Sequence, residues 1–248
     1  MEFRILGPVR IHRGGDDDAV SGSKQRTMLA ALLLAEGRTV SDDGMIWMLW
    51  GERPPATAAS QVQTYASRIR RRVGGAVRLE RIHCGYRMTH DDIDFDYRSF
   101  RQSVDRAHRA LADGRHAEAA VGLCAALELW RGAAVADTTE HMIQAEQPHL
   151  EEERIEALEL RIEAELRLGR ERELISELRS LVSRHPLRER LRALLMTALY
   201  RADRQADAIA EFQICRRLLD REYGVAPGRL LTRTYQGLLT GEALFQIP

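Results

Sequence analysis

One segment, residues 57–73, constrains the fold more than any other part of the chain, because its apolar residues recur with helical spacing. They follow one another at steps of four, three, four and four: Ala58, Val62, Tyr65, Ile69 and Val73. Residues at these steps share one face of an α-helix. The segment is therefore predicted to form an amphipathic helix whose apolar face packs on a core.

The opposite face of this helix carries side chains of the kind that contact DNA. Hydroxyl and amide groups give way to arginines toward its C-terminal end, in the set Thr57, Ser60, Gln61, Thr64, Ser67, Arg68 and Arg71. Short polar side chains can approach base edges, and arginines reach phosphates or the acceptor pair of a guanine. The face suits the major groove of DNA. A solvated surface helix is the alternative, since runs of charge are commonly exposed to water.

A β-hairpin is predicted directly after the helix. Gly74 and Gly75 end the helix, residues 76–81 alternate as a half-buried strand does, residues 82–85 form a tip, and residues 86–88 return. The basic side chains of this hairpin are Arg81, His83 and Arg87. A helix followed by a basic hairpin is the layout of a winged helix, so these three residues are predicted to contact DNA as well.

The residues before this helix complete a small domain. The expected elements are, in order, two short strands within residues 3–12, a polar loop over 14–18, a helix over 24–36, a short helix ending near residue 50 and an extended loop at 54–55. Ser23 is the expected N-cap of the first helix, and Ser41 or Asp42 that of the second. Strands, three helices and a terminal hairpin thus occupy about the first ninety residues.

The two parts of the chain differ in charge. Residues 1–90 hold 14 Lys and Arg against 9 Asp and Glu, whereas residues 91–248 hold 23 against 28. The basic excess lies in the part that contains the helix described first, as binding to DNA requires.

The remainder of the sequence shows an internal repeat. Residues 168–170 (Leu-Gly-Arg) and 202–204 (Ala-Asp-Arg) lie 34 residues apart, and their downstream apolar positions correspond, as in the pair Leu178 and Phe212. An earlier copy begins at residue 113, with Leu123 at the matching position, so the array is interrupted around residues 132–147. A period of 34 residues is typical of tetratricopeptide helix pairs, which stack on their neighbours and commonly bind proteins.

The sequence offers no chemistry for catalysis. Cys84, Cys124 and Cys215 are isolated, no histidines have metal-ligand spacing, and neither a phosphate-binding loop nor a nucleophile elbow is present. We therefore expect no enzyme activity, metal or cofactor. The longest apolar run, residues 28–35, is too short to span a bilayer, and no secretory signal opens the chain, so a cytoplasmic protein is expected.

Several blocks occur in the order found in one known family. They are residues 6–8, 24–26, 49–51, 54–57, 129–132, 185–190, 198–201, 205–208 and 222–227. On these blocks the chain resembles, almost end to end, a small member of the Streptomyces antibiotic regulatory protein family. The resemblance implies a mainly α fold with a small β component. A winged helix-turn-helix of the response-regulator type would occupy residues 1–92, and an all-α, tetratricopeptide-like activator domain residues 93–248.

The resemblance also implies a function. Such a protein would be a nucleoid-associated transcriptional activator of a secondary-metabolite gene cluster, bound as a dimer to direct repeats near the promoter −35 region. It would recruit RNA polymerase through the sigma factor and the alpha subunit. Family wings commonly carry an arginine where this chain has Ile82, which leaves the register of the wing contact open. The sequence has no counterpart of the ATPase and sensor repeats of large members, so nucleotide control is not expected.

Two other functions remain open from the sequence. One is a repressor or generic DNA-binding regulator without polymerase contact. The other is a helical scaffold whose winged helix binds protein, and that reading conflicts with the basic excess of residues 1–90.

Overall fold

The computed structural model describes residues 1–90 and 93–241, and these form two compact units. The first consists of Met1–Asp105 with Ala125–Ile155, and the second of Arg106–Cys124 with Glu156–Pro248. The expected domain boundary at residue 92 lies outside the described residues, and the division into 1–92 and 93–248 stays a prediction. The expected mainly α fold class with a small β component is confirmed.

Two small sheets lie in the first unit. The first has the strand order β3-β2-β1-β7 and the second the order β4-β6-β5. The strands are β1 (Glu2–Arg4), β2 (Arg10–Arg13), β3 (Asp16–Ala19), β4 (Thr39–Ser41), β5 (Val77–Ile82), β6 (Gly85–His90) and β7 (Asp94–Phe95). All neighbouring strands are antiparallel except β1 and β7, which are parallel.

The expected polar loop over residues 14–18 is wrong in its second half, because Asp16–Ala19 forms β3. Gly14 and Gly15 have φ of 60° and 97°, values that glycine adopts without strain, and they reverse the chain in two residues. The backbone of β3 then pairs with β2 from Arg13↔Asp16 to Arg10↔Ala19. Residues 16–18 are all aspartates, so they lack the apolar alternation from which a strand is predicted. An edge strand can form through backbone pairing alone.

Three helices cover the core of the first unit: α1 (Ser23–Leu34), α2 (Asp42–Trp50) and α3 (Ala58–Val73). The core between them contains Met28, Leu29 and Met45, all fully buried. The expected cap of α1 is wrong, because Gly22 occupies the N-cap position and Ser23 is already helical. The expected cap of α2 is confirmed at Ser41, whose Oγ accepts a hydrogen bond from Gly44 N at 3.1 Å.

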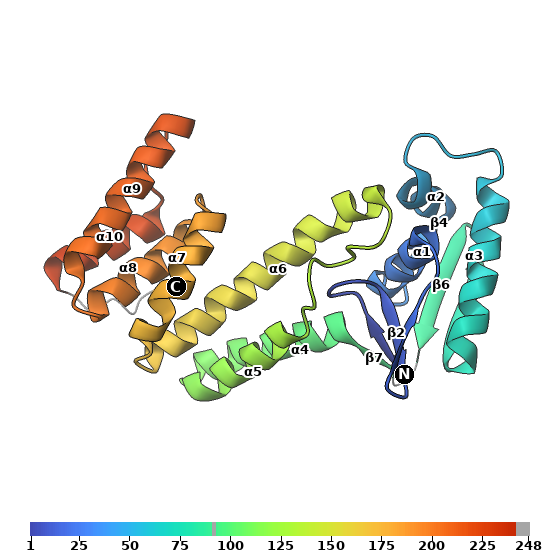
Figure 1. Ribbon diagram of the computed structural model, residues 1–248, viewed down its shortest axis with the longest axis horizontal. Coiled ribbons are helices and arrows are strands. Elements are labelled where there is room, and N and C mark those ends of the chain that lie inside the picture. Colours follow the sequence, from blue (N-terminus) through green and yellow to red (C-terminus); the bar gives the residue numbers. More distant parts are fainter. Residues whose placement is uncertain (91–92, 242–248) are drawn as a thin grey trace. The chain divides into compact units, whose positions relative to one another are not determined.

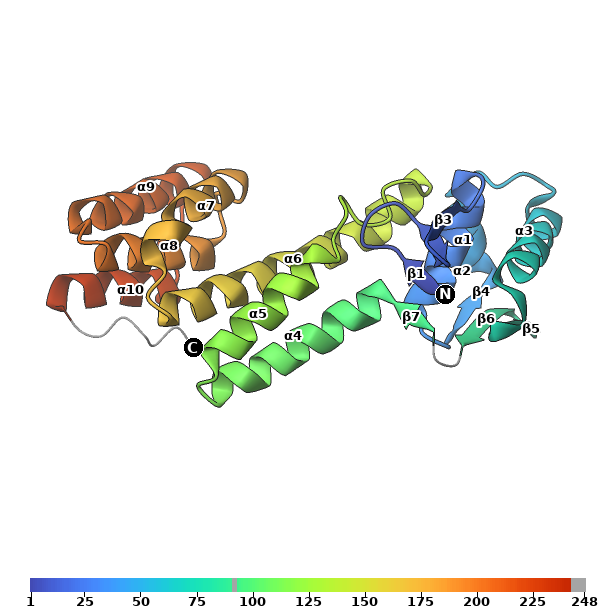
Figure 2. The same cartoon turned by 60° about the horizontal axis from the view of Figure 1, so that its bottom comes forward.

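The described residues after β7 are mostly helical. Its helices are α4 (Asp96–Ala112), α5 (His116–Glu128), α6 (Glu140–Arg167), α7 (Glu171–Arg184), α8 (Glu189–Arg201), α9 (Gln205–Tyr223) and α10 (Arg229–Thr240). In the second unit α8 packs against α7, α9 and α10 (Figure 2). The matching repeat positions Leu123, Leu178 and Phe212 are all buried, and Phe212 stacks on Tyr235 with ring centroids 4.0 Å apart. None of the described helices is long and apolar enough to cross a bilayer.

The interruption of the repeat array has a structural role within the first unit. Residues 129–139, which we call the junction segment, contact the turn between β1 and β2 and the start of β2. Arg131 N donates to Leu6 O at 2.7 Å, and Val135 N donates to Ile5 O at 2.9 Å. Asp137 accepts from Val9 N at 2.8 Å and pairs with Arg10 at 2.6 Å. The segment departs from the repeat pattern because its polar groups complete the hydrogen bonding of the N-terminal sheet.

Asp96, the first residue of α4, strengthens this contact. Its carboxylate accepts hydrogen bonds from Ile5 N at 3.0 Å and Leu6 N at 3.2 Å, and it pairs with Arg131 at 2.5 Å. The side chain is buried, and burial raises the pKa of Asp96 to about 6.

Candidate nucleic-acid interface

Helix α3 is amphipathic, as expected, and its buried face fixes which side chains reach solvent. Ala58, Val62, Ile69 and Val73 are buried, and so is Ala66, which the spacing argument omitted. The small side chain of Ala66 completes the face between Val62 and Ile69. Figure 1 shows α3 at the edge of the first unit, beside the second sheet.

Tyr65 was expected on the buried face but is only half-buried. Its ring stacks on Trp50 of α2 with centroids 6.4 Å apart. Its hydroxyl donates to Gln61 Oε1 at 3.1 Å. Tyr65 therefore lies at the border of the two faces, because its ring needs an apolar neighbour and its hydroxyl a polar one.

The first turns of α3 carry the expected hydroxyl and amide groups. Thr57, Ser60 and Thr64 are exposed. The Ser60 and Thr64 hydroxyls donate to the backbone oxygens of Thr57 and Ser60, each at 2.9 Å. Their oxygens keep lone pairs that can accept from a base edge. Gln61 differs, because its Nε2 donates to Thr57 Oγ1 while its Oε1 accepts from Tyr65, so both ends of the amide are engaged.

The last turns of α3 carry two arginines that differ from the paired ones of the wing. Ser67, Arg68 and Arg71 are exposed. Within residues 1–90 and 93–241, neither Arg68 nor Arg71 forms an ion pair or a side-chain hydrogen bond. Both line a shallow hollow of about 380 Å³ together with Arg72 of α3 and Ser21 and Gln25 at the start of α1. Cations without carboxylate partners beside hydroxyl and amide groups suit a phosphate.

Arg70 has a different environment from Arg68 and Arg71. Its Nε donates to Leu79 O of β5 at 2.7 Å, which ties the helix to the hairpin that follows. Ser21, Gln25 and Arg72 were not among the expected site residues. Ser21 and Gln25 lie far from α3 in the sequence, and no residue pattern connects them to it.

The expected hairpin is present, with a tighter tip than predicted. Ile82 and Gly85 pair across the strands, so only His83 and Cys84 form the turn instead of four residues. Gly85 lies against β4, where an added Cβ would fall 2.1 Å from Val40 O. No other residue fits there without movement of the backbone.

The three expected basic residues of this hairpin are not equivalent. Arg81 pairs with Asp42 at 2.5 and 2.8 Å, and its guanidinium lies 4.8 Å from the centre of the Tyr86 ring. The hydrogen bond from Arg81 lowers the pKa of Asp42. Arg87 pairs with Glu80 at 3.0 Å. His83 is exposed at the tip and, in the described part of the chain, has no partner.

Comparison with known families identifies the helical part of the chain. Residues 95–239 match the model of the bacterial transcriptional activator domain.

Relatives at the level of the whole chain include regulatory proteins from Streptomyces. The regulatory protein DnrI of Streptomyces peucetius is 33% identical over 98% of this chain and 93% of its own length. The transcriptional regulator RedD of Streptomyces coelicolor is 34% identical over 100% and 73%. The regulatory protein AfsR of Streptomyces coelicolor is 40% identical over 98% of this chain, which spans only 24% of that protein.

A solved structure has the same fold. Mycobacterium tuberculosis EmbR, determined in complex with a low affinity phosphopeptide, is similar with a TM-score of 0.91 and 31% identity. The match covers 98% of this chain and 65% of the EmbR chain.

Proposed function

The chain belongs to the Streptomyces antibiotic regulatory protein family of transcriptional regulators, and we propose that it activates a secondary-metabolite gene cluster by binding DNA through α3. Helix α3 inserts into the major groove with Thr57, Ser60, Gln61, Thr64 and Ser67 facing base edges. Arg68 and Arg71 bind phosphates or a guanine. The wing is formed by β5 and β6. Its residues His83, Arg81 and Arg87 lie near the DNA backbone beside this groove.

One observation carries this proposal: the solvent face of α3 combines exposed hydroxyls with two arginines that have no carboxylate partner in the described residues. On a helix that only faced water, acidic side chains one turn away would pair with these arginines and stabilise the helix. Several other arginines of the first unit do pair with carboxylates, for example Arg10 with Asp137 and Arg131 with Asp96.

We further propose that two protomers bind head to tail on direct repeats near the −35 region. One winged helix makes few phosphate contacts, and coupling two of them raises affinity without new base contacts. Recognition helices on direct repeats are spaced by about one helical turn, roughly 10–11 base pairs, or a multiple of it.

Footprinting of the purified protein on the promoters of its own gene neighbourhood tests the DNA proposal. Protection of paired direct repeats is expected. A spacer insertion of about five base pairs turns the second repeat to the opposite face of the duplex, so it should abolish the gain from pairing. Equal affinity for one repeat, two repeats and two repeats with the insertion would show a monomeric binder.

The bound protein is proposed to act in the cytoplasm, associated with the nucleoid, by recruiting RNA polymerase through the sigma factor and the alpha subunit. Transcription from a repeat-containing promoter by purified RNA polymerase, with and without the protein, tests this step. A rise in transcript is expected. Footprinting without a rise would assign the protein to the repressors or to generic DNA-binding regulators.

A further inference from the structure

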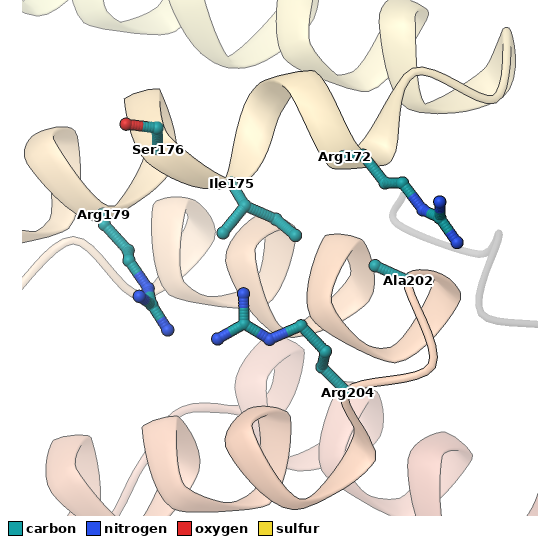
Figure 3. A pocket seen from close by; sticks show the side chains of 6 residues that line it. All are labelled: Arg172, Ile175, Ser176, Arg179, Ala202 and Arg204. Atoms are coloured by element: carbon teal, nitrogen blue, oxygen red, sulfur yellow. The ribbon is translucent and has the colours of Figure 1, made fainter.

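A pocket in the second unit gathers three arginines. It has a volume of about 480 Å³ and is lined by residues of α7 and of the turn between α8 and α9. The lining residues are Arg172, Ile175, Ser176, Arg179, Ala202 and Arg204 (Figure 3). In Figure 3 the side chains of Arg179 and Arg204 extend toward one another.

Two of the three arginines in the pocket have no counter-charge in the described part of the chain. Arg204 pairs with Asp207 of α9 at 2.5 Å. Among the residues that the structure describes, neither Arg172 nor Arg179 forms an ion pair or a side-chain hydrogen bond. Like charges that line one hollow raise the local potential, and this arrangement favours a bound anion.

Several other arginines of the second unit pair with carboxylates. Arg161 pairs with Glu177 at 2.5 Å, Arg188 with Glu159 at 2.6 Å, and Arg192 with Glu211 at 3.2 Å. These pairs stabilise the packing of neighbouring helices. Arg172 and Arg179 do not serve that purpose, and their guanidinium groups remain available for a ligand.

We propose that this pocket docks an acidic segment of a protein partner. Guanidinium groups bind carboxylates through two parallel hydrogen bonds, which Arg172 and Arg179 can each provide. Ile175 and Ala202 supply an apolar surface beside the arginines, and Ser176 adds a hydroxyl. The matching ligand therefore carries Asp or Glu next to an aliphatic residue. This inference goes beyond the binding of DNA and does not depend on it.

The surroundings of the pocket favour a peptide over a DNA duplex. Glu173 of α7 and Asp203 in the turn before α9 are exposed beside the lining residues. A duplex carries one negative charge per about 1.7 Å of its axis, so it would bring phosphates close to these carboxylates. A short acidic segment can contact the arginines alone. Stacked helix pairs of this kind commonly present such binding surfaces.

Binding of the labelled full chain to immobilised short peptides tests the proposal. The peptides have equal aliphatic content, and their Asp and Glu residues are replaced stepwise by Asn and Gln. Binding should rise with the number of carboxylates. The double variant Arg172→Glu with Arg179→Glu should bind the acidic peptides at least about ten-fold more weakly, or about 1.4 kcal/mol.

The double variant Arg216→Glu with Arg217→Glu is the matched control, since both arginines are exposed on α9 and the change in charge is the same. It should bind acidic peptides like the parent. Circular dichroism and thermal melts establish that each variant is folded. If the pocket variant Arg172→Glu with Arg179→Glu is not folded, the double variant Arg172→Gln with Arg179→Gln is used in its place.

Four results would overturn the proposal. The parent binds acidic and amide peptides equally, the parent binds no peptide, or both double variants lose the same affinity. In the fourth, the pocket variant loses affinity for promoter DNA while its peptide binding stays unchanged, and DNA is then the occupant. Failure of DNA binding in the parent would affect the proposed function alone.

Discussion

Helix α3 and the wing both present arginines, but they use them differently. On α3, Arg68 and Arg71 have no acidic partner among the described residues. In the wing, Arg81 and Arg87 are paired with Asp42 and Glu80. A cation that is already paired must give up its carboxylate before it binds a phosphate, and part of the gain is then lost. From this difference we expect α3 to supply most of the affinity in the proposed DNA binding, and the wing arginines mainly to fix the shape of the hairpin.

The largest expected effect is on the stability of the second unit, and it should leave the affinity for DNA unchanged. Leu178 is fully buried in α7, and Phe212 stacks on Tyr235 in the same unit. Leu178→Ala and Phe212→Ala should each lower the free energy of unfolding by about 2–5 kcal/mol, since each leaves a cavity. Chemical denaturation measures this loss. The affinity of the folded fraction for DNA should stay unchanged, because neither residue belongs to the first unit. Melting temperatures within a degree or two of the parent would contradict the repeat assignment.

The next effect concerns Asp96, which holds a third paired arginine, Arg131. Burial raises the pKa of Asp96 to about 6, so the folded chain binds this proton more tightly than the unfolded chain. Its contribution to the free energy of unfolding is complete below about pH 4 and falls as the pH rises through about 6, by up to about 3 kcal/mol. Asp96→Asn should remove this slope. Urea unfolding of both proteins between these pH values measures it, and an unchanged slope in the variant would assign it to other groups.

Arginine substitutions on α3 test the comparison directly. Arg68→Ala and Arg71→Ala should each cost about 1–3 kcal/mol of binding if the arginine reads a guanine, with relaxed specificity at one base. If the arginine contacts a phosphate, the affinity for all DNA sequences should fall alike, and the slope of log affinity against log salt concentration should decrease by about one. Gel shifts at several salt concentrations distinguish the two. Arg233→Ala, an exposed arginine of α10, is the control and should bind like the parent. Folded Arg68 and Arg71 variants with parental affinity would refute the role of α3.

The smallest effect is expected in the wing. Exposed ion pairs contribute about 0–1 kcal/mol, so Arg81→Ala and Arg87→Ala should change stability and DNA affinity by less than the α3 substitutions do. Arg81 holds the pKa of Asp42 below its usual range. The ion pair therefore forms throughout the neutral pH range, and it is lost only when the pH falls below the pKa of an ordinary aspartate. Gel shifts near neutral pH measure the DNA effect. A loss as large as that of Arg71→Ala would show that the pairs open on DNA and would remove the distinction between helix and wing.

Much of the fold follows from local patterns. The apolar spacing of residues 57–73, the paired glycines after them and the 34-residue repeat predict α3, the hairpin and the helix pairs, since each pattern describes contacts a few residues apart or repeated at a fixed interval. The strand β3 and the N-cap of α1 were mispredicted. In both cases backbone conformation at a glycine decided the outcome, and side-chain polarity gave no signal of it.

The sequence by itself determined the type of each long helix, the face of α3 that is buried and the set of polar residues on the other face, because helical periodicity ties these properties to spacing along the chain. Only the tertiary structure decided which basic side chains have an acidic partner and what lies beside those that have none in the described residues. Asp42 pairs with Arg81, and Asp96 pairs with Arg131. Ser21 and Gln25 lie in the same hollow as Arg68 and Arg71. Such pairs join residues tens of positions apart, and their formation depends on how helices and strands pack, which spacing along the chain does not encode.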